Sequence, residues 1–255
     1  ARPPAPTFSP GNVIVAHDAK PANWMPALPG AVPAVLGTDV ITVQGATGTG
    51  FDLAGTADVV NANIPITPTS AFTQGDLVFV SDCQTGDIFR VTNNPTGSGP
   101  TTVLTYGSAS NYANRLSKEY ALEAEVMTYR SNTYFVRDTG RQTLVGQPIQ
   151  ALSVIDANGN QSDLLDGIED MEIDYGEDLD NDGNADWYVD ADQLGGGSGN
   201  TGNVVSVRIN LLVRSVEGNI TSQAVTINNF HGGVVNPADR RLRRVFASTT
   251  QTRNH

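Results

Sequence analysis

Residues 204–215 alternate between apolar and polar side chains, and this pattern constrains the fold more than any other feature of the chain. Successive side chains of a β-strand point to opposite faces, so a period of two held over this length predicts a strand with one buried face. Such a strand needs neighbours in a sheet and a second layer to cover it. The apolar positions are Val205, Val207, Ile209, Leu211 and Val213, and the polar ones include Ser206, Arg208, Asn210 and Arg214.

Glycine and proline separate the remaining segments into short pieces. The chain has 26 Gly and 14 Pro in 255 residues, which favours many turns between short strands and argues against long helices. We therefore expect a mainly β (α+β) fold built on an antiparallel sheet with hairpins. Prolines are dense in residues 1–36, which predicts an irregular lead-in, followed by a single β-rich globular domain over 37–255.

Several shorter segments carry strand and hairpin signals. Residues 77–81 and 88–92 are rich in β-branched and aromatic side chains and predict one hairpin, and residues 122–129 and 133–137 predict a second. Residues 223–228 follow a turn after the alternating strand and are expected to pair with it.

One short helix is predicted near 163–170. Leu164, Leu165, Ile168 and Met171 share a face at helical spacing, and Asp163 stands where an N-cap would. The alternating residues that follow predict that this helix runs directly into a strand.

Acidic residues are concentrated in one segment. Residues 163–192 contain thirteen of the 27 Asp and Glu and neither Lys nor Arg, although the net charge of the whole chain is only −12. Acidity confined in this way points to a local cation site. A pI near 4.5 makes nucleic acid an unfavourable partner, because the phosphate backbone repels an acidic surface.

Within this segment, residues 178–186 reproduce most of a calcium-binding loop. Oxygen donors stand at positions 1, 3, 5 and 9, a backbone carbonyl at position 7, and Gly183 at the sharp turn. The position of the usual bidentate Glu is taken by Val189, so further oxygens would have to come from Asp190, Glu177 or water. The predicted ligands of a weak Ca²⁺ site are Asp178, Asp180, Asp182, Asn184 and Asp186.

The affinity expected for this loop is on the order of 10⁻⁴ to 10⁻³ M, as in extracellular calcium modules. The alternative is an acidic turn that simply stays hydrated. Repulsion between four carboxylates on one turn favours the cation, because like charges disfavour the compact loop unless they are neutralised.

Enzymatic constellations are sparse. His17, His231 and His255 are far apart in the sequence, and there is neither a nucleophile elbow nor a phosphate-binding loop. Two carboxylates that meet only in the folded chain leave no sequence mark, but catalysis is not the expected function. Cys83, the single cysteine, is expected to be a small buried side chain. The arginines of 240–244 are expected on the wet face of an edge strand, against an acidic partner, or against the acidic segment of the chain itself.

Four segments in a consistent order resemble PilW-type minor pilins of the type IV pilus assembly machinery. The resemblance extends discontinuously from about Val13 to the end of the chain. Its segments are residues 164–178 with the Asp-Asn-Asp-Gly loop that follows, 205–215, 240–246 together with Arg253 and Asn254, and the middle portion 75–83 with 134–137.

This resemblance implies a non-enzymatic structural subunit that joins other minor pilins and the major pilin, primes pilus assembly and sits at or near the pilus tip beneath an adhesin. The family begins with a hydrophobic helix that anchors the subunit in the inner membrane. That helix is absent from these 255 residues, so we expect the globular part of a longer protein. The implied location is the cell-surface pilus, assembled from the inner membrane facing the periplasm. Any disulfide partner of Cys83 would lie in the missing region.

Two other functions remain open. A minor pseudopilin of type II secretion shares the same general architecture, and its loss would affect the secretion of folded proteins. A secreted calcium-dependent adhesive or carbohydrate-binding β module fits the composition as well.

Overall fold

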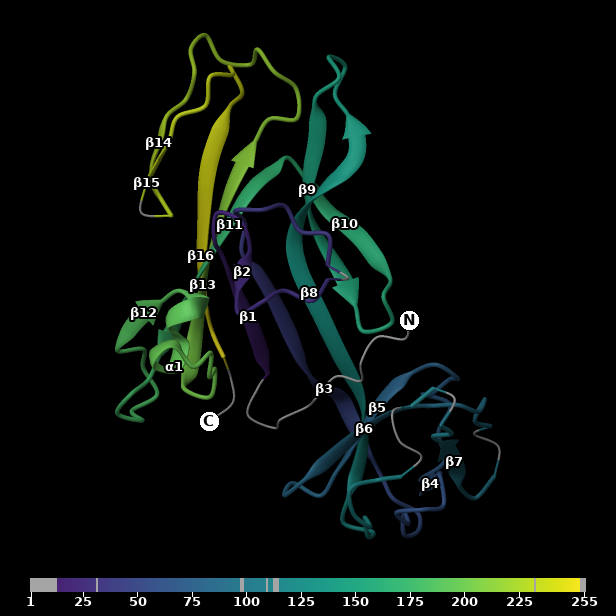
Figure 1. The fold of residues 1–255 in the computed structure, drawn as a ribbon. Coiled ribbons are helices and arrows are strands. Elements are labelled where there is room, and N and C mark those ends of the chain that lie inside the picture. The colour runs from purple at the N-terminus through teal and green to yellow at the C-terminus, as the bar shows by residue number, and fades with distance from the viewer. Residues whose placement is uncertain are drawn as a thin grey trace. The chain divides into compact units, whose positions relative to one another are not determined.

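The computed structural model describes residues 13–252 except 31, 97–98, 109, 112–114 and 232 (Figure 1). Antiparallel strands make up most of its regular structure, which confirms the mainly β prediction. The elements are β1 (Ile14–Ala19), β2 (Trp24–Met25), β3 (Val40–Asp52), β4 (Asn63–Ile66), β5 (Leu77–Ser81), β6 (Gly86–Arg90), β7 (Thr102–Thr105), β8 (Glu125–Gln142), β9 (Pro148–Asp156), β10 (Gln161–Asp166), β11 (Ile168–Glu177), β12 (Trp187–Val189), the 3₁₀ turn η1 (Ala191–Gln193), α1 (Leu194–Gly197), β13 (Val204–Arg214), β14 (Ile227–Phe230), β15 (Gly233–Val235) and β16 (Arg243–Gln251).

The chain folds as two compact units. Of the described residues, the first unit includes those of 44–131 and the second those of 14–43 and 132–252, so that β3 and β8 contribute residues to both. The boundaries predicted from the sequence, a lead-in over 1–36 and one domain over 37–255, stay a prediction. Residues 1–12 lie outside the described part of the chain, and Ile14–Ala19 form strand β1.

The first unit is built around two hairpin-like pairs. β5 pairs with β6 and with the beginning of β8, and β4 pairs with β7. The hairpin predicted over 77–81 and 88–92 is confirmed, with the second strand starting at Gly86. Cys83 lies in its turn at a positive φ of 66° and is exposed, so the expectation of a buried cysteine was wrong. Apolar side chains from these strands form one core, which includes Ile64, Ile66, Val78, Val80, Leu104, Tyr106, Tyr120 and Val126.

The described residues of the second unit contain two larger sheets and the small two-stranded sheet β14-β15. One larger sheet has the order β10-β9-β8-β3-β1-β2, and the other has the order β12-β11-β13-β16. The strand predicted over 204–215 is β13, which is confirmed, and it lies between β11 and β16. Ser206 and Leu212 are buried on one face of β13, so the prediction of a single buried, apolar face was wrong. On the other face, Val205 and Val207 are buried and Leu211 is half-buried. The buried side chains of β11 on the same face are Met171, Ile173 and Tyr175.

The helix predicted near 163–170 does not form. Residues 161–166 are strand β10, which pairs with β9, and Ile168 begins strand β11. The turn between them is made by Gly167 with a φ of 82°. Leu164 and Leu165 sit at an irregularity in the pairing with β9 and are about half exposed, so the apparent helical spacing marks no common buried face.

Two of the predicted pairings were also wrong. Residues 125–142 form one continuous strand, β8, where a hairpin with a turn at Ser131 and Asn132 was expected. Residues 227–230 form β14, which pairs with β15, while the actual neighbours of β13 are β11 and β16. In both cases pairing with distant strands overrides the local turn signal. No helix in the described residues is both long and apolar enough to cross a membrane.

Candidate functional site

The acidic loop over residues 178–186 connects β11 to β12. Glu177 of β11 is paired with Trp187 of β12, so the loop closes the end of an antiparallel hairpin. The backbone N–H of Asp186 donates to the carbonyl of Glu177 at 2.9 Å, which closes the base of the loop. Gly183 has a φ of 86°, the left-handed conformation that a glycine adopts without steric cost. The loop therefore turns where the sequence predicted.

Asp178 organises the loop from inside. Its side chain is buried, and its two carboxylate oxygens accept backbone N–H groups from Asn181 at 2.7 Å and from Gly183 at 2.8 Å. A longer bond of 3.3 Å comes from Asp182. Burial raises the pKa of Asp178, but these backbone donors outweigh burial and lower the pKa overall. The carboxylate is therefore held in its charged form.

Three of the five predicted calcium ligands lie together. Asp178, Asp180 and Asp186 each place one carboxylate oxygen within 4.8 Å of the others, while the carboxylate of Asp182 is not part of this group. The carboxylate of Asp182 instead accepts the backbone N–H of Asn184 at 2.8 Å. The role of all five as ligands stays a prediction.

Electrostatic repulsion is present within the loop. The N–H of Asp182 lowers the pKa of Asp180, but the carboxylate of Asp182, burial, and the carboxylates of Asp186 and Asp178 together outweigh this bond and raise the pKa overall. Among the described residues, no Lys or Arg forms a salt bridge with a carboxylate of this loop. The donor set is all oxygen and anionic, which suits a hard divalent cation.

The two acids that were considered as additional ligands have other partners. Glu177 is fully buried, where its oxygens accept the indole N–H of Trp187 at 3.1 Å and the backbone N–H of Gly195 at 2.8 Å. Asp190 belongs to a different group of carboxylates. Any ligand beyond the five predicted ones would therefore have to be water or a backbone oxygen.

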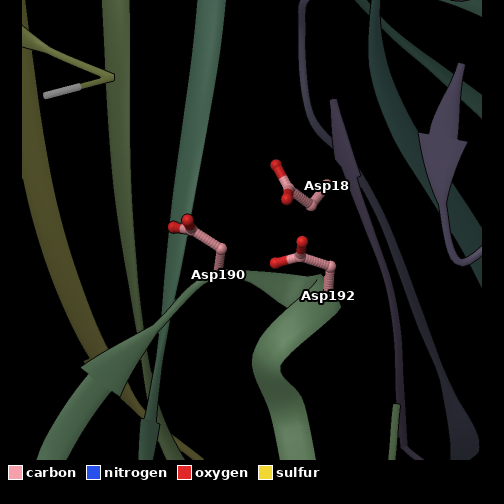
Figure 2. Close-up of side chains that lie close together, drawn as sticks. All are labelled: Asp18, Asp190 and Asp192. Carbon is pink, nitrogen blue, oxygen red and sulfur yellow. The ribbon is translucent and has the colours of Figure 1, made fainter. Parts of the chain in front are cut away.

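A second group of carboxylates consists of Asp18 of β1, Asp192 of η1, and Asp190, which immediately precedes η1 (Figure 2). One carboxylate oxygen of each lies within 4.8 Å of the others. Lys20 forms ion pairs with Asp18 and, at 2.7 Å, with Asp192. Burial raises the pKa of Asp18, whereas Lys20 lowers the pKa of Asp192. The sequence contained no signal for this group, because Asp18 lies far from the acidic segment and meets it only through the fold.

The remaining acids of β11 are paired with cations from neighbouring strands and loops. Arg214 contacts Glu169 at 3.3 Å, and Arg208 lies 3.7 Å from Asp174. His231 lies 3.4 Å from Asp170. The acidic segment therefore separates into a loop, the lysine-bridged group, a row of acids on β11 that cross-link the sheet, and two aspartates of β10, Asp163 and Asp166, that pair with Arg137 and Arg141.

The arginines of 240–244 also differ from one another in burial and in their partners. Arg241 and Arg243 are buried, and Arg243 forms ion pairs with Glu169 and Asp239. Arg244 is exposed at the start of the edge strand β16. The expectation of a solvated edge-strand face is thus wrong for Arg241 and Arg243. The alternative expectation, contact with the acidic segment of the chain itself, is confirmed for Arg243, which pairs with Glu169 of that segment.

The histidines show no arrangement suited to zinc or to nucleophilic catalysis within the described residues. His17 is buried and its Nδ1 lies 2.8 Å from the carbonyl of Pro26, while His231 belongs to the acid row. His255 lies outside the described residues.

Residues 133–254 match a family of proteins that assemble type IV pili. The matching family is PilW, described as type IV pilus-assembly protein W, and the match supports a PilW-type assignment over somewhat less than half of the chain. It contains the whole sheet β12-β11-β13-β16 and the acidic loop. This family is a structural, non-catalytic kind of protein that works with other pilus components. No curated protein and no solved structure matched the chain.

Proposed function

We propose that this chain is a non-enzymatic minor pilin that primes type IV pilus assembly and sits at or near the pilus tip. The observation that carries the proposal is the PilW match over residues 133–254, which contains a complete four-stranded sheet. The partners are other minor pilins, the major pilin and a tip adhesin. The location is the cell-surface pilus, assembled from the inner membrane facing the periplasm.

Deletion of the gene in its source bacterium tests this role. We expect surface pili to be lost or sharply reduced and to return when the intact gene is supplied from a plasmid. Normal piliation together with defective secretion of folded proteins would identify a pseudopilin of type II secretion. Normal piliation and normal secretion would contradict both, and chelator-sensitive glycan binding would then support the adhesive β module.

We further propose that Ca²⁺ stabilises the acidic loop, with ligands from Asp178, Asp180, Asp182, Asn184 and Asp186. The support is the convergence of three carboxylates and the raised pKa of Asp180. A bound divalent cation would remove this repulsion and fix the loop at the end of the β11–β12 hairpin. The lysine-bridged group is a poorer candidate, because Lys20 already supplies a positive charge there.

Calorimetry with Ca²⁺ and Mg²⁺ tests the site. At 10 mM Ca²⁺, a dissociation constant on the order of 10⁻⁴ to 10⁻³ M corresponds to about 1.4 to 2.7 kcal/mol of added stability. Asp180→Ala should remove the heat of binding and the rise in melting temperature. Asp52→Ala, at an exposed position in the other unit, should leave both unchanged. Equal binding by both variants would contradict the assignment.

A further inference from the structure

Strand β16 forms one edge of the four-stranded sheet. It pairs with β13 through nine consecutive residue pairs, from Arg243 opposite Arg214 to Gln251 opposite Ser206, without a bulge. Among the described residues, no strand pairs with its other side. From Arg244 onward every residue of the strand is exposed. A regular row of backbone donors and acceptors is therefore available on that side.

The register shows which residues carry these free groups. The N–H of Thr252 donates to the carbonyl of Val205 at 2.8 Å, in the same register as the β13–β16 ladder. Hydrogen-bonded and non-hydrogen-bonded pairs alternate along an antiparallel ladder, so even-numbered residues of β16 bond to β13. The residues that direct their backbone N–H and C=O groups outward are Val245, Ala247, Thr249 and Gln251.

Two other sheet edges in the second unit, β12 and β10, carry features that usually prevent unwanted pairing. β12 has only three residues, and β10 has an irregular register and two aspartates in ion pairs with Arg137 and Arg141. Residues 245–251 have no charge, no proline and no bulge. A long regular edge of this kind is a template for strand addition.

The chemistry of this edge defines the segment that fits it. Phe246 is opposite Leu211, which is opposite Met171, so the three side chains lie on the same face of the sheet. Phe246 is nevertheless 57% exposed. An apolar side chain on an added strand, opposite Phe246, would cover it. Arg244 is exposed and forms no salt bridge with a described residue. A carboxylate opposite Arg244 would lie in a non-hydrogen-bonded pair, where facing side chains are closest.

We propose that β16 accepts an extended segment of a partner protein as an additional antiparallel strand. The segment is uncharged where it pairs with residues 245–251 and has a carboxylate near its C-terminal end that faces Arg244. Backbone hydrogen bonds provide the affinity, and the apolar contact with Phe246 and the ion pair with Arg244 set the register. This inference rests on the proposed function in one respect, because it takes the partner to be another pilus component.

A synthetic peptide tests the edge directly. The capped peptide TTTTTVVD, aligned antiparallel, places valines opposite Phe246 and Val245 and aspartate opposite Arg244. In titrations followed by ¹H–¹⁵N NMR, we expect shifts at the amides of Val245, Ala247, Thr249 and Gln251. The peptide TTTTTVVK should bind at least tenfold more weakly.

Two proline variants separate the free side of the strand from the paired side. Thr249→Pro removes an N–H that points away from β13 and leaves the hydrogen bonds to β13 intact. It should therefore weaken binding of the peptide TTTTTVVD at least tenfold without lowering the melting temperature of the protein. Ser248→Pro removes an N–H that bonds to β13 and should lower the melting temperature. If Thr249→Pro does not fold, Arg244→Glu provides a second arm, because it should weaken TTTTTVVD and strengthen TTTTTVVK.

The outcomes are distinct. Absence of binding at millimolar peptide, or binding unaffected by both Thr249→Pro and Arg244→Glu, overturns the proposal. Dimerisation of the protein alone in sedimentation equilibrium, lost in Thr249→Pro, would make a second copy the occupant and also overturns it. If gene deletion abolishes pili but Thr249→Pro restores them fully, this inference fails while the proposed function stands. If gene deletion leaves pili intact, the proposed function fails whatever the peptide does.

Discussion

Arg243 and Arg244 are adjacent arginines that should differ sharply in their contribution to stability. The side chain of Arg243 is 1% exposed, and its guanidinium donates two hydrogen bonds to Glu169, at 2.6 and 3.1 Å, and two to Asp239. Removing one partner of a buried ion pair costs about 3 to 5 kcal/mol. Because the carboxyl side chains of Glu169 and Asp239 are 21% and 41% exposed, water relieves part of this cost. We expect Arg243→Met to lower the free energy of unfolding by about 2 kcal/mol.

Arg244→Met is the matched control. The side chain of Arg244 is exposed and forms no ion pair with a described residue, so we expect the free energy of unfolding to change by less than about 0.5 kcal/mol. Urea unfolding followed by circular dichroism measures both, and thermal melting should show a decrease of about 4 to 8 °C for Arg243→Met alone. Equal effects of the two substitutions would refute the reasoning from burial.

Two further predictions concern the same unit. Burial lowers the pKa of His231, but Asp170 and other nearby carboxylates outweigh it and raise the pKa to about 9. Protonated His231 therefore contributes about 1 kcal/mol to the free energy of unfolding, after allowance for solvent screening. This contribution is fully present below pH 6.5 and is lost as the pH rises through 9. His231→Asn should therefore flatten the dependence of the free energy of unfolding on pH over that range. Gly167→Ala should cost about 2 to 3 kcal/mol in chemical unfolding, because φ is 82° and a Cβ would lie 2.5 Å from the carbonyl oxygen of Arg214. Gly140→Ala, with a φ of 74° and open space around the Cβ, should cost only about 1 kcal/mol; a similar loss from both would contradict the steric argument.

The sequence determined those features that depend on neighbours along the chain. The alternation in residues 204–215 predicted strand β13, and the spacing of aspartates around Gly183 predicted a tight acidic turn. The hairpin of β5 and β6 followed from two β-rich runs close together. In each case the side-chain period or the backbone preference of a few consecutive residues is sufficient.

Only the tertiary structure decided which strands pair and which charges meet. Pairing with β9 made residues 161–166 a strand despite their helical spacing, and Asp18 joined Asp190 and Asp192 from the other end of the sequence. The buried Arg243 and the exposed Arg244 are chemically identical in the sequence. Burial and pairing depend on contacts between residues that are distant along the chain, and a local pattern carries no information about those contacts.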